Sequence, residues 1–84
     1  MADVTLTDDA IEGFDRLPVR IKARVATVFD RLAKWPEISG AKPLRGELAG
    51  CYRVRTGDYR VQFRVEGDLV IVERIGHRDG FYED

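Results

Sequence analysis

The chain has 84 residues with 14 Lys and Arg, 15 Asp and Glu, a formal net charge of −1, 44% hydrophobic and 35% charged residues. A chain of this size forms one small globular domain, and its core leaves little room for a deep cofactor cavity, so we expect no cofactor. No apolar run approaches the roughly 18 to 20 residues of a membrane span, and the acidic start is unlike a signal peptide. We therefore expect a cytoplasmic protein that does not bind membranes. A single Cys and a single His exclude an internal disulfide and argue against a metal site.

The first half of the chain predicts a strand and two helices. Val4 and Leu6 suggest a short strand, and Thr7 is placed to cap a helix that Pro18 ends. A second apolar stripe predicts a helix that stops at Pro36. The members of this stripe are Ile21, Val25, Val28, Phe29 and Leu32. Two helices joined by about one turn form a hairpin with one continuous apolar face.

The second half predicts a loop and then three strands. Residues 37–50 contain Gly and Pro with little periodicity and are interpreted as a loop. Strands are predicted over 51–56, 59–66 and 69–76, joined by two Gly-Asp pairs suited to type II′ turns. The predicted fold class is α+β in a single domain over residues 1–84: a strand, a two-helix hairpin and a three-stranded antiparallel meander, with the helices packed on one face of the sheet.

Arginines dominate one face of this meander. If Gly57 and Asp58 form the first turn, Arg55 pairs with Arg60, and Arg53 lies diagonally near Arg60 on the face that the helices leave exposed. Two arginines opposite each other repel, so stability alone does not favour this arrangement. One interpretation is a solvated face that water and salt screen. The other is that converging guanidinium groups bind a phosphate.

The end of the chain adds groups suited to phosphodiester chemistry. The segment I-G-H-R-D-G-F-Y places His77 and Arg78 where the meander ends, with Tyr82 a few residues later. A cation cluster, an imidazole and a phenol are groups that break a phosphodiester without a metal. These residues, with the stretch L-R-G-E-L-A-G-C-Y-R-V-R-T-G-D-Y-R-V-Q-F-R-V, closely resemble the RelE/ParE superfamily of toxins from type II toxin-antitoxin systems. The order of predicted elements is also similar to that of the superfamily.

The motifs specify the superfamily better than the branch, and we favour the RelE branch, whose members cut mRNA on the ribosome by activating the 2′-hydroxyl of the RNA. This resemblance implies an endoribonuclease, or mRNA interferase, that needs no metal. The implied catalytic residues are Arg60, His77, Arg78 and Tyr82, and the implied substrate-binding residues are Arg45, Arg53, Arg55 and Arg64. In this interpretation Arg60 and Arg78 stabilise phosphoryl charge, His77 exchanges a proton, and Tyr82 orients or stacks on a base.

Two alternatives remain. A ParE-like protein would inhibit DNA gyrase without cutting anything, and a toxin-like protein would bind only its antitoxin and DNA. His77 and the arginines favour the nuclease, whereas the slightly acidic charge and the short segment after Tyr82 favour the alternatives. All three imply a cognate antitoxin partner in a hetero-oligomer. The nuclease adds mRNA on the ribosome as a partner, and the ParE-like alternative adds gyrase.

Overall fold

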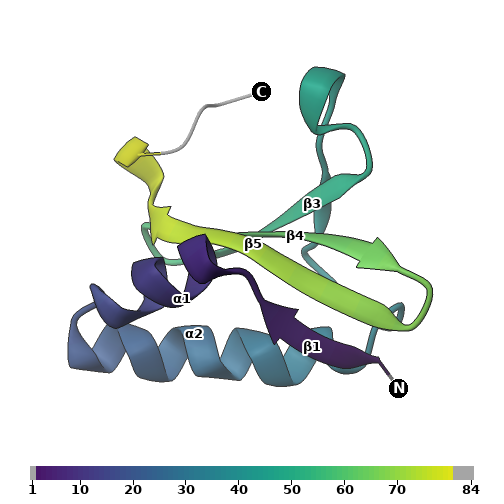
Figure 1. The fold of residues 1–84 in the computed structure, drawn as a ribbon. Coiled ribbons are helices and arrows are strands. Elements are labelled where there is room, and N and C mark those ends of the chain that lie inside the picture. The colour runs from purple at the N-terminus through teal and green to yellow at the C-terminus, as the bar shows by residue number, and fades with distance from the viewer. Residues whose placement is uncertain (1, 81–84) are drawn as a thin grey trace.

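The computed structural model describes residues 2–80, which form two helices packed on a five-stranded mixed sheet (Figure 1). The strands are β1 (Asp3–Leu6), β2 (Lys42–Pro43), β3 (Cys51–Thr56), β4 (Tyr59–Glu66) and β5 (Leu69–His77). The helices are α1 (Asp8–Asp15) and α2 (Val19–Leu32), with short 3-10 turns η1 (Gly46–Leu48) and η2 (Arg78–Gly80). The sheet order is β1-β5-β4-β3-β2. The predicted α+β class is confirmed.

The meander has the register that the sequence predicts. Arg55 pairs with Arg60 and Val54 with Val61 across β3 and β4. Gly57 and Gly67 both have a φ of 59°, and no residue other than glycine has a positive φ among those described. Positive φ at the first turn residue alone is what a type II′ turn requires. The two Gly-Asp turns therefore fix which residues face the helices.

Two features of the sheet lie outside the sequence prediction. β1 pairs in parallel with β5, so the N-terminal strand extends the meander at one edge. The segment predicted as a loop contains β2, which pairs with β3 at the other edge, and η1. β2 has only two residues, too few for strand periodicity to be visible in a Gly- and Pro-containing segment.

A β-bulge changes the alternation of β5. Gln62 pairs with Arg74 and the next residue, Phe63, pairs with Val72, so Glu73 is the extra residue. A bulge lets two successive residues occupy one face of a strand. Val72 and Ile75 therefore both reach the core, although three positions separate them. Glu73 and Arg74 lie between them on the other face.

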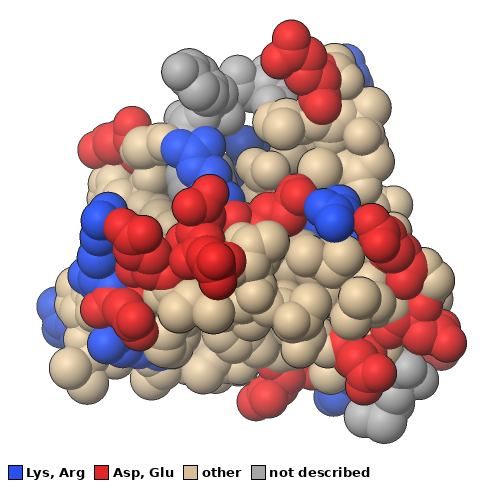
Figure 2. Space-filling view, in the orientation of Figure 1, with Lys and Arg blue, Asp and Glu red and all other residues tan. Residues whose placement is uncertain are grey.

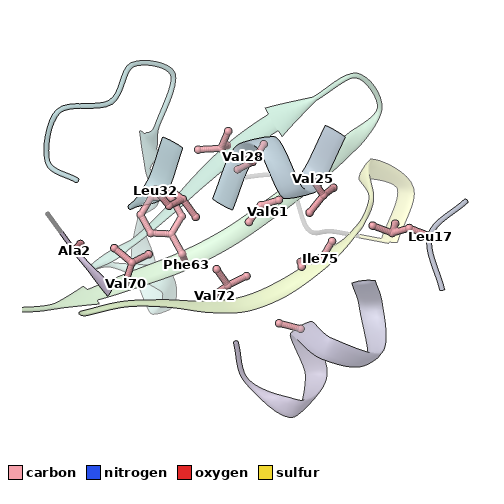
Figure 3. Close-up of a cluster of buried hydrophobic side chains, with 12 residues drawn as sticks. Ala2, Leu17, Val25, Val28, Leu32, Val61, Phe63, Val70, Val72 and Ile75 are labelled. Carbon is pink, nitrogen blue, oxygen red and sulfur yellow. The ribbon is translucent and has the colours of Figure 1, made fainter. Parts of the chain in front are cut away.

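The core lies between the sheet and the helices (Figure 3). Figure 3 shows Phe63 and Val61 of β4 pointing toward Leu32, Val28 and Val25 of α2. The twelve buried residues of the core are Ala2, Ala10, Leu17, Val25, Val28, Leu32, Val54, Val61, Phe63, Val70, Val72 and Ile75. The opposite face of the meander carries most of the polar residues of β3 and β4. None of the described helices has the length and apolar composition to cross a membrane.

Thr7 ties the start of α1 to β5. Its Oγ1 accepts a hydrogen bond from the Ala10 amide at 3.2 Å and donates one to the Glu73 carbonyl at 3.0 Å. Asp8 and Asp9 occupy the first turn, where the helix dipole favours anions. The predicted N-cap is confirmed, and it also fixes α1 beside the second half of β5.

Candidate functional site

We call the sheet face turned away from the core the arginine face. It is formed by Cys51, Arg53, Arg55, Arg60, Gln62, Arg64, Glu73 and Arg74, from β3, β4 and β5. Its centre is not exposed as the sequence interpretation assumed: Arg53 and Arg60 are each 6% exposed and Gln62 is 8% exposed. Burying a charged group costs free energy unless it is compensated, so these positions are not ordinary solvated arginines.

A row of polar side chains crosses four strands of this face. Lys42 of β2 pairs with Arg53 of β3, Arg53 pairs with Gln62 of β4, and Gln62 pairs with Arg74 of β5. Paired residues point to the same face of a sheet, so the carboxamide of Gln62 is flanked by two guanidinium groups. The next row pairs Arg60 with Arg55 on one side and with Gly76, which has no side chain, on the other.

Arg64, at the far end of the face, is paired with carboxylates of its own chain. Its Nη1 donates to Glu73 Oε2 at 2.8 Å and its Nε donates to Glu66 Oε2 at 3.1 Å. The Cys51 thiol donates to Glu73 Oε1 at 3.3 Å. Burial, and next the hydrogen bond to Glu73, raise the pKa of the Cys51 thiol. The predicted role of Arg64 in substrate binding stays a prediction, and in this structure its charge is balanced locally.

A hollow of about 570 Å³ lies between this face, α1 and η1. Its lining includes four carboxylates, namely Asp9, Glu12, Glu47 and Glu73, and two guanidinium groups, Arg16 and Arg74. Glu12 forms an ion pair with Arg16. Acidic side chains predominate on the surface over α1 and β1 in Figure 2. Carboxylates thus outnumber guanidinium groups in the lining of this hollow, whereas the adjoining positions of β3 and β4 carry Arg53, Arg55 and Arg60.

A smaller hollow of about 330 Å³ adjoins it and is lined by Arg45, Glu47, Leu48, Gln62 and Arg74. Arg45 precedes η1 and is exposed. Gln62 was missed by sequence reasoning. The predicted register already paired it with Arg53, and that pairing was the signal that could have found it.

The structure separates His77 from the arginines. His77 pairs with Tyr59, whose neighbour on the same face of β4 is the core residue Val61. The rings of Tyr59 and His77 meet edge to face with centroids 5.2 Å apart. The His77 side chain therefore lies on the helix side of the sheet, while Arg60 lies on the other. Its Nδ1 accepts a hydrogen bond from the Asp79 amide at 3.2 Å, which leaves Nε2 to carry the proton of the neutral ring.

Arg78 follows directly in η2 and is held only loosely. Its amide donates to the Asp58 carbonyl at 2.8 Å, and its guanidinium lies 3.9 Å from the Asp58 carboxylate and 4.0 Å from that of Asp79. The side chain is 57% exposed, so it can reach solvent-borne ligands. Tyr82 lies outside the described residues.

Comparison with known proteins places the chain in a family. The family described as ParE toxin of type II toxin-antitoxin system, parDE, matches residues 4–80. Toxin RelG of Mycobacterium tuberculosis is 38% identical over 82 residues, which cover 94% of this chain and 93% of the relative. Toxin RelE of the same organism is 41% identical over 64 residues, 75% of this chain and 65% of the relative.

Solved structures agree with this assignment. The RelBE2 toxin-antitoxin complex from Mycobacterium tuberculosis contains a chain with a TM-score of 0.80 and 33% identity, covering 92% of this chain and 98% of that one. The isolated RelE toxin of E. coli has a TM-score of 0.77 at 20% identity, covering 92% of this chain and 84% of that one, and shares the fold. The chain therefore belongs to the ParE toxin family of type II toxin-antitoxin systems, within the RelE/ParE superfamily.

Proposed function

We propose that this toxin is an endoribonuclease that cuts mRNA on the ribosome. The RNA 2′-hydroxyl gives up its proton and attacks the neighbouring phosphorus, the bond from phosphorus to the 5′-oxygen breaks, and the departing 5′-oxygen takes up a proton. The carrying observation is the burial of Arg53 and Arg60, which are diagonal neighbours across β3 and β4 on the arginine face. Rigid strands hold both groups, so little reorganisation would accompany charge development on a phosphoryl oxygen. Arg55, exposed beside them, suits the flanking backbone phosphates. The relatives named RelG and RelE support the RelE-like branch.

In this proposal the residues have different roles. Arg60 and Arg53 stabilise the negative charge on the oxygens of the pentacoordinate phosphorus. The exposed Arg78 contacts the same phosphate from the end of β5. Arginine keeps its proton near neutral pH, so it cannot take the proton of the 2′-hydroxyl. His77 and Tyr82 stay proposed catalytic groups. The ring of His77 packs on the helix side of the sheet, so His77 would reach the RNA only past the end of β5.

A cognate antitoxin is the proposed partner, in a hetero-oligomer. Relatives of the same fold have been solved as toxin-antitoxin complexes, including RelBE from E. coli and RelB-RelE from Methanococcus jannaschii. The charge separation of this surface, acidic over α1 and basic on β3 and β4, offers an antitoxin two patches of opposite sign.

The test is induction of the toxin in a bacterial host, followed by mapping of transcript 5′ ends. We expect cuts in phase with codons, and their loss with Arg60→Ala. Removing one preorganised donor costs about 2.7 to 4 kcal/mol, or roughly 10² to 10³ in rate. Arg20→Ala, which removes the same charge from the exposed start of α2, is the matched control and should cut normally. Circular dichroism must show that both variants fold.

Gyrase inhibition is the second candidate, favoured by the position of His77 on the face opposite Arg60. A protein that only binds needs no proton-transfer group beside its arginines. A supercoiling assay with purified gyrase separates the two functions. Arrested supercoiling without codon-phased cuts would reject the nuclease.

A further inference from the structure

The starting observation is the side chain of Gln62 at the centre of the arginine face. It is 8% exposed, and its carboxamide makes no hydrogen bond with any other residue in the range 2–80. The oxygen and nitrogen of this carboxamide are not among the fully buried side-chain atoms without a partner in residues 2–80, so they remain accessible for hydrogen bonds with a ligand. Gln62 lines both hollows of this surface. Two donors and an acceptor are therefore presented to whatever enters them.

The smaller hollow combines groups that suit one flat heterocycle. Leu48 supplies an apolar wall, and Arg45 and Arg74 supply guanidinium planes. Guanidinium planes stack on aromatic rings. Arg74 donates through Nη2 to the Gly80 carbonyl, a contact that restricts the orientation of its guanidinium group at the edge of the hollow. Glu47 adds a carboxylate that can accept from an exocyclic amino group.

We propose that Arg45, Leu48, Gln62 and Arg74 form a pocket that reads one purine base of the bound RNA, with Gln62 as the specificity-determining residue. This inference rests on the proposed function, because it assumes single-stranded RNA on the arginine face. Sequence-specific RNA recognition uses unstacked bases that stack on side chains and hydrogen-bond along their edges. Purines present two adjacent groups on the N7 edge, which a carboxamide or a guanidinium can contact in a bidentate manner.

The pocket also has the right place for this task. Gln62 is the cross-strand partner of Arg53, and Arg60 lies two residues away on the same face of β4. A phosphate between Arg53 and Arg60 would therefore have its own or a neighbouring base within reach of Gln62. An amide carries no net charge, so it adds discrimination among bases without adding general affinity for phosphate.

The direct test uses a property of the sequence. Gln62 is the only Gln, and the chain has no Asn, so the side-chain amide region of a nitrogen-proton correlation spectrum of the ¹⁵N-labelled full chain contains the Gln62 pair alone. The probes are 2′-O-methyl tetranucleotides of A, G, C and U, which cannot be cut by 2′-hydroxyl attack, with tripolyphosphate as the anion control. We expect the Gln62 signals to move with the purine probes at concentrations about tenfold lower than with the pyrimidine probes, and not with tripolyphosphate.

Three results would overturn the inference. Equal shifts with all four tetranucleotides or with tripolyphosphate would make Gln62 a part of a phosphate site. Unmoved Gln62 signals while backbone amides of Arg53 and Arg60 shift would place the base elsewhere. Gln62 signals that respond only to a protein partner would make this a protein contact.

A cellular experiment separates this inference from the proposed function. Gln62→Leu keeps a similar volume without hydrogen-bonding groups. Gln62→Glu keeps the shape but replaces the two N–H donors of the amide with an acceptor oxygen. We expect both folded variants to lose about tenfold in the ratio of purine-directed to pyrimidine-directed cuts, a ratio taken within each variant and therefore independent of its overall rate. An unchanged preference in Gln62→Leu would refute the pocket while leaving the nuclease intact. Absence of cutting by the unmodified protein would refute the nuclease, whatever the spectra of Gln62 show.

Discussion

Gly13→Ala tests how closely α1 is packed against β5. A Cβ at residue 13 would lie 2.3 Å from the backbone oxygen of Ile75 and 3.3 Å from its carbonyl carbon. Carbon-oxygen contacts of the closest kind in proteins are about 3.3 Å, so helix and strand would have to separate by about 1 Å. Ile75 pairs with Val61 inside the sheet, which leaves α1 as the element that moves. Such a shift would loosen the packing of Ala10, which is fully buried.

Two opposing effects set the change in the free energy of unfolding that Gly13→Ala causes. Alanine in a helix interior is favoured over glycine by about 1 kcal/mol. Overpacking costs about 1 to 3 kcal/mol, and the upper end applies because the obstacle is a backbone carbonyl of a paired strand. We expect a net loss of about 2 kcal/mol in the free energy of unfolding, or roughly 10 °C in Tm for a domain of this size.

Urea and thermal denaturation followed by circular dichroism measure this loss. Ala26→Gly, at an exposed position of α2, is the reverse substitution where nothing crowds the helix, and it should cost about 1 kcal/mol. If Gly13→Ala equals or exceeds the unmodified protein in stability, α1 does not contact β5 as closely as described here.

Three further predictions concern the cap, the thiol and the arginine face. Thr7→Ala should lower the free energy of unfolding by about 1 to 2 kcal/mol in urea denaturation, since it removes the helix cap and the bond to β5; Thr7→Ser should restore most of it. The raised pKa of Cys51 favours the neutral thiol in the folded state, so its contribution to stability is present at neutral pH and is lost as pH rises through that pKa. Iodoacetamide should accordingly react more slowly with the folded than with the unfolded chain, and Glu73→Gln should speed the folded reaction; equal rates would contradict the hydrogen bond. Arg60→Ala should abolish growth inhibition, and His77→Ala should weaken it less, because only Arg60 lies on the arginine face; full growth inhibition by a folded His77→Ala would remove His77 from the proposed catalytic groups.

Local sequence signals were enough to predict the meander. Each Gly-Asp turn requires positive φ at its glycine, and a two-residue turn sets the register of the pairs that follow it, which in β5 holds up to the bulge at Glu73. The same reasoning predicted the Thr7 cap, because a capping side chain and an acidic first turn act within one helical turn. These features depend on residues close together in the chain.

The arrangement of the site depended on distant contacts and was harder to predict. Alternation along β5 breaks at Glu73, and a bulge carries no distinctive residue type here. Sequence proximity suggested that His77 acts with Arg78, but the register turns His77 toward Tyr59. The burial of Arg53 could not be predicted either, because alternation assigns a face to a residue but not the depth of that face.

Net charge says little about the partner of this protein because the charges are distributed unevenly over its surface. The acidic residues of α1 border one side of the larger hollow, and Glu66 and Glu73 balance Arg64 at one end of the arginine face. Screening confines the influence of exposed charges to about 10 Å at 0.1 M salt. A bound polyanion would therefore respond to the buried guanidinium groups it contacts more than to the total of −1. The same argument implies that Glu73→Gln, which removes one of the two carboxylate partners of Arg64, strengthens RNA binding and makes it more sensitive to salt, and a titration at several salt concentrations can measure both effects.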